Sequence, residues 1–594
     1  MAEPERGHRR TAPRPRLMFA LDAHAARSCP VKTHNAFHPG MSLPPADEGL
    51  REVFHGGIAF QAEVLTQLLS GFDGSVFDGR ALTERSSAEQ ERAALDAMAS
   101  GVDVLIGPLL PRDLVAHRSG RPDLLLRDPE GGYHPAEIKS HRVSDPRGGG
   151  STLTWSALSD PLRRQVLEGH RFRYTWRLND LLQLAHYRRM LETIGHAASL
   201  PLAAVVGSDD LPALGRVLSW VDLDAALLPP SPRASSAVAA AAPESLVESS
   251  ELTGVGEPSG AIERVSALAR YDVEHAFRVE IALVAASLEP HDPPVLLPVA
   301  NRECGWCQWW DVCRPQLDDD DLSLRISKSP LDVYEIRVLR DLGVATVAEL
   351  AATDLEALLP DYLPRVTHRV GAEDRLRLAW RRSVLMARGV DFDRVTQGPI
   401  EVPSATLEID LDIETSSDDR VYLWGFAVSD ARDGSHYYRH FSAFQPLDDA
   451  AEQALAIAAM SWLRDLVDGV DTFVYHYSDY EVVRLQRLAT ASGDEVLAWA
   501  VDWARQHFVD LFTAIRTHFF GTQGLGLKVV ATRAAGFRWR DESPGGLNSQ
   551  AWFDDAVSGA TADVRAAARQ RVLEYNEDDV EATWHVRRWL RTLS

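Results

Sequence analysis

Lysine is scarce in this chain of 594 residues, and positive charge is in deficit. Only four of the 62 basic residues are lysine (Lys32, Lys139, Lys328 and Lys528), and the formal net charge at pH 7 is -24. That balance argues against a protein that coats nucleic acid non-specifically, because the phosphate backbone selects for a positive surface. It argues less against an enzyme, since bound cations offset the charge of a carboxylate centre. A lysine inside a motif points to chemistry that needs a compact ammonium group.

Long apolar runs are also missing. No segment approaches the length of a membrane span, so we expect no membrane partner. The basic, proline-bearing residues 1–17 are not followed by the apolar segment of a secretory signal. We therefore expect a disordered tail and a cytoplasmic protein. No G-x4-G-K-[S/T] segment occurs, so the chain lacks a helicase motor, and unwinding of a duplex would need a separate helicase partner.

The length and patterning predict an α/β protein of several domains. The first, residues 18–320, begins and ends with cysteine and contains an insertion rich in Pro, Ala, Ser and Gly at 229–260, which we expect to be flexible. Short helices follow in residues 321–398. Residues 399–594 open with an alternating strand and form a final α/β unit.

The helical region 321–398 has two features of interest. Its Leu342-Gly343-Val344 turn resembles a helix-hairpin-helix, a module whose turn amides often bind phosphate. A plain connecting bundle is the alternative. The region also groups basic residues: Arg365, Arg369, Arg375, Arg377, Arg381, Arg382 and Arg388.

The chain has four cysteines, and all of them fit one site. Cys29 stands alone, whereas Cys304, Cys307 and Cys313 form a C-x2-C-x5-C motif. Thiolates spaced this closely can converge on one centre, and four soft ligands suit iron–sulfur or zinc. Two disulfides are the alternative, but nothing places the chain in an oxidising compartment.

A first candidate nuclease centre lies between these cysteines. The segment GRPDLLLRDPEGGYHPAEIKSHR predicts two strands joined by a hairpin that contains Gly131 and Gly132. Asp123 and Glu137 would lie on adjacent strands and share a divalent cation. Lys139, two residues after Glu137, would lie on the same strand face. A surface hairpin with an ion pair is the simpler alternative.

The segment QLAHY adds Gln183 and Tyr187, which lie one helical turn apart on one face. With the Pro122-Asp123…Glu137-x-Lys139 pattern and the cysteine frame, it resembles the RecB-family PD-(D/E)xK nucleases over most of residues 20–320. The resemblance implies a restriction-endonuclease-like core with catalytic Asp123, Glu137, Lys139, Gln183 and Tyr187. It also implies a structural [4Fe–4S] cluster on the four cysteines, with zinc as the alternative.

One motif departs from that family. The family usually places a His or Glu metal ligand shortly after a helical glycine, and Phe60 and Gln61 occupy those places here. Gln61 could coordinate a cation through its carbonyl oxygen, and Glu63 or His55 could substitute. The activity of the first centre depends on whether one of these residues supplies the metal ligand.

A second candidate centre begins in LEIDLDIET, residues 407–415. Period-two alternation places Glu408, Asp410, Asp412 and Glu414 on one strand face. Aligned like charges repel, and cations relieve that repulsion. A D-x-E pattern at the start of a strand is how RNase H-like exonucleases begin their two-metal site.

Later motifs complete this set. Glu481 stands where DnaQ-like exonucleases place a second acid, and Tyr575 and Asp579 form a Y-x3-D pair on a helix. Together they resemble the DEDDy exonucleases, which implies Mg²⁺ or Mn²⁺ at Asp412, Glu414, Glu481 and Asp579 and 3′-to-5′ polarity. Asp510 is a supporting acid or a helix N-cap. Lys528 could contact a substrate phosphate.

These patterns predict a metal-dependent nuclease that acts on DNA, or on RNA, in DNA repair or processing. A nucleic-acid-binding scaffold with an inactive first domain is one alternative, motivated by Phe60 and Gln61. A redox-sensing protein, in which the cluster reports oxidation, is another.

Overall fold

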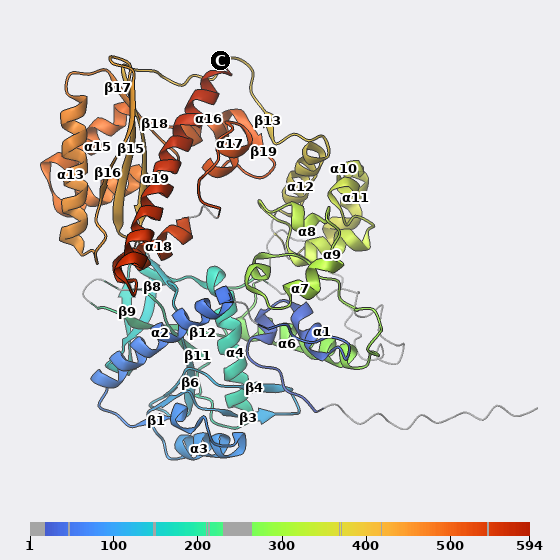
Figure 1. Cartoon of the computed structure of the whole chain (residues 1–594). Helices are drawn as coiled ribbons and strands as arrows, with labels where there is room; N and C mark the ends of the chain where they lie inside the picture. Colours follow the sequence, from blue (N-terminus) through green and yellow to red (C-terminus); the bar gives the residue numbers. More distant parts are fainter. Residues whose placement is uncertain are drawn as a thin grey trace, which may run out of the picture. The chain divides into compact units, whose positions relative to one another are not determined.

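The computed structural model describes residues 18–45, 48–146, 150–209, 211, 214–229, 264–367, 369, 371–416, 419–542 and 546–593 (Figure 1). The predicted tail, 1–17, and residues 230–260 of the predicted insertion lie outside them. The chain folds into two compact units. The N-terminal unit comprises Met1–Leu324, Leu331–Thr346 and Asp354–Leu376, and the C-terminal unit comprises Arg325–Pro330, Val347–Thr353 and Arg377–Ser594. The region 321–398 is divided between the two.

A mixed sheet of eight strands, in the order β1-β2-β5-β6-β11-β12-β8-β9, forms the centre of the N-terminal unit. The pairs β1–β2 and β6–β11 are parallel, whereas the other neighbours are antiparallel. Its strands are β1 Val76–Asp78, β2 Val104–Ile106, β5 Leu124–Arg127, β6 Tyr133–Ile138, β8 Thr152–Ala157, β9 Asp160–Glu168, β11 Leu202–Val206 and β12 Val217–Asp222. The small pairs are β3 Leu110–Asp113 with β4 Arg118–Gly120, and β7 Ser144–Pro146 with β10 His170–Phe172.

The predicted hairpin is confirmed as β5 and β6, which pair antiparallel with Leu124 opposite Ala136. Gly131 and Gly132 form its turn with φ of 102° and 80°, values that L side chains rarely adopt. After β6 the chain crosses through helix α4 to β11, which returns parallel to β6. This crossover places α4 over β6, so that one helix face points at the carboxyl end of that strand.

Helices surround this sheet and connect it to the cysteines. The α-helices described in this part of the chain are α1 Pro30–Phe37, α2 Glu48–Gly71, α3 Ser87–Ala99, α4 Leu178–Thr193, α6 Ala267–Ala286, α7 Trp310–Cys313 and α8 Leu322–Arg325. Helix α1 packs on α6, and their apolar contacts include Val31, Phe277 and Ile281. The helical region continues with α9 Val333–Asp341, α10 Val347–Ala352, α11 Leu355–Tyr362 and α12 Ala372–Ala387.

The C-terminal unit is built on a sheet of five strands in the order β16-β15-β14-β17-β18. The pairs β14–β15 and β15–β16 are antiparallel, and β14–β17 and β17–β18 are parallel. Its strands are β14 Leu407–Thr415, β15 Val421–Asp430, β16 Ser435–Ser442, β17 Thr472–His476 and β18 Phe508–Asp510, and a separate pair joins β13 Phe392–Arg394 to β19 Phe519–Gly521.

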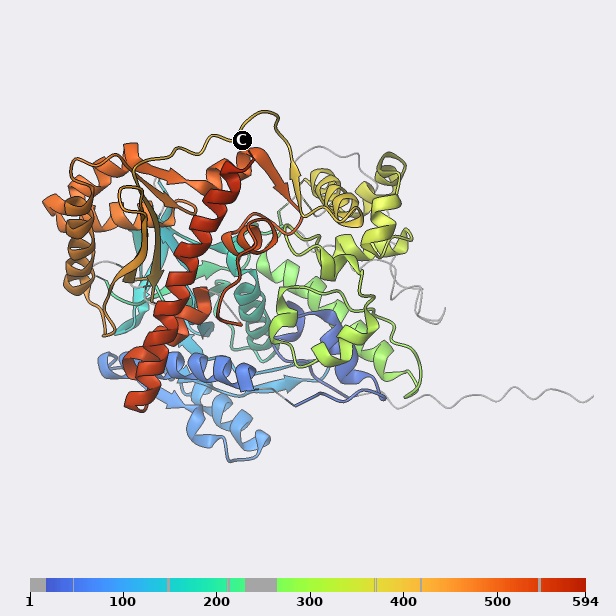
Figure 2. The ribbon, with the colours of Figure 1, turned by 45° about the horizontal axis from the view of Figure 1, so that its top comes forward.

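The two faces of this sheet have different chemistry. Leu407, Ile409, Leu411 and Ile413 of β14 pack into one apolar core with α13, α14 and α15. The alternate acids of β14 lie on the other face, which α19 covers (Figures 1 and 2). The helices are α13 Asp449–Val467, α14 Tyr480–Ser492, α15 Glu495–His507, α16 Leu511–His518, α17 Leu527–Arg533, α18 Gly546–Ser558 and α19 Ala562–Arg591. The predicted alternation is therefore confirmed. No helix within the described ranges is long and apolar enough to cross a membrane.

Two of the four acids on β14 are neutralised by arginines of α19. Arg587, which is 1% exposed, donates to Asp410 at 2.7 and 3.1 Å and also contacts Glu408. Arg591 donates to Glu408 at 2.6 and 3.1 Å. Guanidinium groups thus relieve the charge repulsion at this end of the strand.

Replacing Arg587 by methionine should destabilise the C-terminal unit strongly. The change leaves Asp410, 0% exposed, as an uncompensated buried carboxylate, and breaking a buried pair in this way costs about 3–5 kcal/mol of unfolding free energy. Arg588→Met is the matched control, because Arg588 is exposed and stacks on Trp584. Denaturant titration of the full chain measures both. Equal unfolding midpoints for the two variants would contradict the expectation.

Candidate functional site

Three carboxylates meet at the other end of β14, away from the Arg587 and Arg591 pairs. Asp412 and Glu414 come from the strand and Asp579 from α19, and one oxygen of each lies within 4.8 Å of the others. Glu414 and Asp579 are each 6% exposed. Carboxylates buried this closely repel one another, and a bound divalent cation is the usual compensation.

Neutral donors orient the two strand acids. Asn576 donates its amide to Asp412 Oδ2 at 2.8 Å, and Ser549 of α18 donates its hydroxyl to Glu414 Oε2 at 2.5 Å. Gly425, opposite Asp412 on β15, makes room, because an added Cβ would lie 1.7 Å from Asn576 Oδ1. Sequence reasoning missed Asn576 and Ser549. A glycine inside a strand signals such a close approach, and Gly425 was that signal.

Donors also hold the two residues of the Y-x3-D pair. Trp539 donates its indole N–H to Asp579 Oδ1 at 2.6 Å, and Lys528 donates to the Tyr575 hydroxyl at 2.6 Å. Lys528 therefore stands among the carboxylates as the ammonium group of the site. Trp539 was not expected, and it lies 40 residues before its partner.

Burial and mutual repulsion raise the pKa values of these acids. The pKa of Asp412 is raised well above its ordinary range by burial, and next by Asp579 and Glu414. Burial, followed by the charge of Asp579, raises the pKa of Glu414 to about 8. Burial likewise raises the pKa of Asp579, which Lys528 lowers in part. Burial and mutual repulsion therefore favour the protonated acids, and a bound cation would compete with those protons.

The fold and this cluster agree with a known family. Residues 410–591 match the family model of the RNase H superfamily. Neither the curated proteins nor the solved structures contain a significant match to the chain. The match leaves residues 1–409 outside its range. The five-stranded unit is thus RNase H-like, and with its acidic cluster it supports nuclease-type chemistry that uses divalent metal ions.

Glu481 lies beside this RNase H-like centre, outside the close group of three. Glu481 is 3% exposed, and its Oε2 lies 3.5 Å from His476 Nδ1. Its charge contributes to the raised pKa of Asp412. Burial, the largest cause, also raises the pKa of Glu481 itself. It therefore borders the three carboxylates without being bonded to them.

Asp510 is a helix N-cap. Its Oδ1 accepts from the backbone N–H of Phe512 at 2.9 Å at the start of α16, and from the N–H of Ser478 at 2.9 Å. Its Oδ2 accepts from the Thr513 hydroxyl at 2.5 Å. These bonds satisfy both oxygens, so of the two roles left open for Asp510 the structure favours the cap.

The first candidate centre forms a bonded cluster in the N-terminal unit. Asp123 precedes β5 and its Oδ2 accepts from the backbone N–H of Ile138, 2.8 Å away. Lys139 donates to Glu137 at 2.8 Å and to Gln183 at 2.9 Å, and Gln183 donates to Glu137 at 2.9 Å. The structure thus brings together the residues expected from β5, β6 and α4.

Tyr187 completes this cluster from the next turn of α4. Gln183 donates to the Tyr187 hydroxyl at 3.4 Å, and that hydroxyl donates to the carbonyl of Arg121 at 3.1 Å. Asp123 is strongly affected by its surroundings: burial, and next the charge of Glu137, raises its pKa well above the ordinary range. A cation bound beside Asp123 and Glu137 would compete with a proton for these carboxylates.

Among the residues whose side chains are described, the first motif contributes the amide of Gln61 to this centre. Gln61 donates its amide nitrogen to Asp123 Oδ1 at 2.6 Å. Glu63, an alternative ligand, instead accepts from Arg216 at 2.8 Å and from Gln67 at 3.1 Å, which turns it away from Asp123. The side chain of His55 lies outside the described residues.

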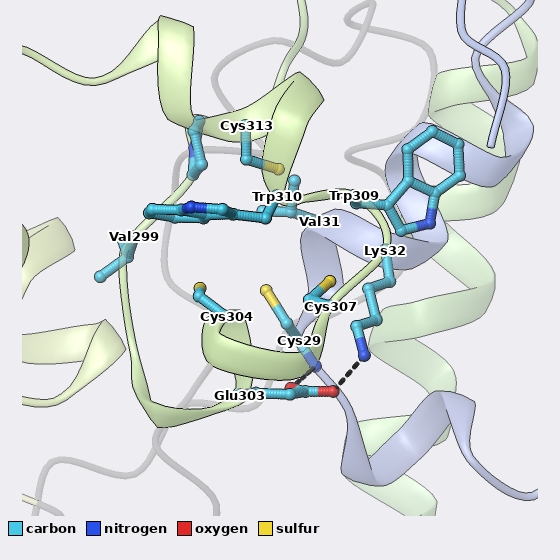
Figure 3. A pocket seen from close by; sticks show the side chains of 11 residues that line it. Cys29, Val31, Lys32, Val299, Glu303, Cys304, Cys307, Trp309, Trp310 and Cys313 are labelled. Carbon is cyan, nitrogen blue, oxygen red and sulfur yellow. Dashed lines mark hydrogen bonds and ion pairs between the residues drawn. The ribbon is translucent and has the colours of Figure 1, made fainter. Parts of the chain in front are cut away.

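All four cysteines line one pocket in the N-terminal unit (Figure 3). None of them forms a disulfide, so the disulfide alternative is not supported. Glu303, next to Cys304, joins this segment to the N-terminal cysteine. It accepts from the N–H of Cys29 at 2.9 Å and from Lys32 at 2.5 Å. Burial raises the pKa of Cys313 to about 12, so a metal group must displace thiol protons to bind.

Without metal, the stability of the C-terminal unit should fall as pH rises. Between the ordinary pKa of Glu414, 4.5, and its folded value of about 8, the folded state binds more protons than the unfolded state. Unfolding free energy therefore decreases with pH through this window. Thermal unfolding from pH 5 to 8 in a chelator, with Glu414→Gln as the control, measures it. Mg²⁺ should reverse the trend, and equal slopes for both proteins would contradict the assignment.

Proposed function

We propose that this chain is a metal-dependent nuclease whose RNase H-like unit removes nucleotides from nucleic-acid ends. The observation that carries the proposal is the close approach of Asp412 and Glu414, on the polar face of β14, to Asp579 of α19, in a segment that matches the RNase H superfamily. Glu481 beside them would supply the fourth carboxylate. Divalent cations bound there supply an activated water and stabilise the charge on the leaving oxygen.

Each side chain around the three carboxylates would have its own role. Asp412, Glu414 and Asp579 would hold the cations, and Asn576 and Ser549 fix two of these acids by hydrogen bonds. The Tyr575 hydroxyl, which accepts from Lys528, would position the attacking water. Polarity from 3′ to 5′ follows from the resemblance to DEDDy exonucleases.

The N-terminal centre is proposed as a second phosphodiesterase site of the RecB type. Asp123 and Glu137 would hold one divalent cation, and Lys139 would orient the water and help to deprotonate it. The bonds of Lys139 to Glu137 and Gln183 support this role, because they aim the ammonium group at the carboxylates. Tyr187 supports Gln183 from the next helical turn.

One observation favours a second candidate function for the N-terminal unit. The Gln61 amide donates to Asp123 Oδ1, where the family's motif would place a metal ligand. A donor at that oxygen competes with a cation for it. The second candidate is therefore a unit that binds nucleic acid without cleaving it, while the RNase H-like centre acts.

The cysteine pocket would hold an iron–sulfur cluster. All four thiols line one pocket, and four soft ligands suit an iron–sulfur group, with zinc as the alternative. Such a cluster would join Cys29, at the start of α1, to the Cys304–Cys313 segment and close the N-terminal unit.

The two centres can be separated by single substitutions. Asp412→Ala should lower stepwise shortening of end-labelled DNA or RNA with Mn²⁺ by at least about 100-fold, since even groups that only orient a metal ligand contribute 10- to 100-fold. Residual cleavage should vanish on adding Glu137→Ala. Glu130→Ala, in the β5–β6 turn, is a matched control. If the wild-type protein binds DNA or RNA but degrades neither, the nuclease proposal is wrong. If Glu137→Ala has no effect on cleavage, the N-terminal unit is better explained as one that binds nucleic acid without cleaving it.

Purification without oxygen should yield iron and sulfide in equal amounts, with the broad visible absorbance of an iron–sulfur cluster. Cys29→Ser and Cys313→Ser should each lose the iron. Each should also lower the melting temperature of the N-terminal unit, because the cluster would no longer join the start of α1 to the Cys304–Cys313 segment. Metal analysis and calorimetry measure this. One zinc per chain in place of iron would contradict the cluster.

A further inference from the structure

A histidine and an arginine that belong to none of the motifs lie beside the centre of the N-terminal unit. His24 directly precedes the short 3₁₀ helix Ala25–Arg27, and this helix packs on α4, which supplies two residues of the centre. Ala23, one residue earlier, belongs to the buried cluster that contains Tyr187 of α4. The segment that carries His24 and Arg27 is therefore fixed against the helix of the centre.

The charges of the centre and of this pair act on one another. Partial desolvation, followed by the charge of Arg27, lowers the pKa of His24. Lys139 and Glu137 of the centre also act on that pKa. Burial raises the pKa of Tyr187, and the charge of Arg27 lowers it in part. The pair therefore borders the carboxylates of the centre.

A hydrogen bond fixes which ring nitrogen of His24 is available. Arg27 donates its Nε–H to His24 Nδ1 at 3.0 Å. A guanidinium group has no acceptor and stays protonated, so Nδ1 accepts and the neutral ring carries its proton on Nε2. His24 is exposed, and within the part of the chain that the structure describes its Nε2 has no protein partner. The ring thus presents one N–H donor to solvent beside the centre.

This arrangement suits an anion better than a cation. A histidine that binds a metal through Nε2 carries its proton on Nδ1 and donates it to an acceptor. Here Nδ1 faces a donor, so His24 does not replace the metal ligand that is missing at Phe60 and Gln61. An N–H group with a guanidinium beside it instead donates well to a negatively charged oxygen, as in a phosphate.

We propose that His24 and Arg27 bind the substrate phosphate at the N-terminal centre, with His24 donating its Nε2–H to a non-bridging oxygen of the phosphodiester beside Asp123 and Glu137. Arg27 orients the ring and supplies the positive charge. The inference rests on the proposed function of this centre and assigns it a substrate contact outside the family's motifs. In a chain of net charge -24, such a local cation gives a phosphate access to two carboxylates.

Substitutions of His24 test the contact when the RNase H-like centre is silenced by Asp412→Ala. His24→Ala should lower kcat/KM for the remaining cleavage about 10- to 100-fold, the usual contribution of a hydrogen bond to a charged group. His24→Gln, whose amide N–H can take the place of Nε2–H, should recover most of the rate. His24→Asn, whose amide lies near the position of Nδ1, should not. His291→Ala, at an exposed histidine after α6, should change nothing.

Phosphorothioate linkages identify the oxygen that His24 contacts. Sulfur in place of one non-bridging oxygen accepts a hydrogen bond poorly. With Mn²⁺, the effect of His24→Ala should therefore shrink on one of the two stereoisomers and persist on the other, because the partner of the donor is already weakened. Equal effects of His24→Ala on both stereoisomers and on the natural linkage would overturn the proposal. A His24→Gln variant as impaired as His24→Asn would also overturn it.

Binding without cleavage gives readouts that do not depend on activity. In an Asp412→Ala Glu137→Ala background, Arg27→Ala should weaken binding of an oligothymidylate. It should also lower the slope of log affinity against log salt by about 0.7, which corresponds to one phosphate contact on a single strand. Arg92→Ala, at an exposed arginine of α3, should leave the slope unchanged.

Manganese binding separates a phosphate donor from a metal ligand. The affinity of the Asp412→Ala protein for Mn²⁺ should be the same with and without His24→Ala, and a weaker affinity would overturn the proposal. If the Asp412→Ala protein cleaves no substrate, the proposed cleavage at the N-terminal centre fails. Oligothymidylate binding then decides this inference, and unchanged affinity in both His24→Ala and Arg27→Ala would overturn it. If that protein cleaves and His24→Ala has no effect, only this inference fails.

Discussion

The central constraint on the C-terminal unit is a row of four carboxylates on one face of β14, pressed against the last helix. Buried like charges cannot stand side by side without compensation. Arg587 and Arg591 supply it for Glu408 and Asp410, and both arginines come from the C-terminal turns of α19. At the other end of the strand, α19 supplies the carboxylate of Asp579 instead of a cation.

One helix therefore divides one strand into a structural half, whose acids pair with arginine, and a proposed metal-binding half. In the structural half the acids are neutralised by Arg587 and Arg591, and these ion pairs fix the position of α19 along β14. That register aligns Tyr575, Asn576 and Asp579 with Asp412 and Glu414, since α19 is a single helix from Ala562 to Arg591. The carboxylates of the proposed metal-binding half suit divalent cations, so the overall acidity of the chain does not conflict with the proposed nuclease.

The N-terminal unit also brings two carboxylates close together, and there a lysine side chain lies beside them. Asp123 and Glu137 are brought together by an antiparallel hairpin, and Lys139 of the same strand segment partly balances them. The arginines grouped in 321–398 are partly paired with acids of the same region. Arg365 pairs with Asp341, Arg375 with Glu335 and Arg381 with Asp393, so the positive charges of these arginines are balanced within the protein.

Local periodicity by itself determined which residues share a face. The alternation of LEIDLDIET fixed the acidic and apolar faces of β14, the Gly131-Gly132 turn fixed the hairpin, and spacing of four residues placed Gln183 with Tyr187 and Tyr575 with Asp579. These follow from the two-residue repeat of a strand and the 3.6-residue turn of a helix. Only the tertiary structure decided what each face meets. The pairing of Asp410 with Arg587 spans 177 residues, and Ser549 reaches Glu414 across 135. No local pattern encodes such partners, because they depend on how distant elements pack. For that reason the sequence could not tell which two acids of β14 are neutralised, that Glu63 turns away from Asp123, or that Asp510 caps a helix.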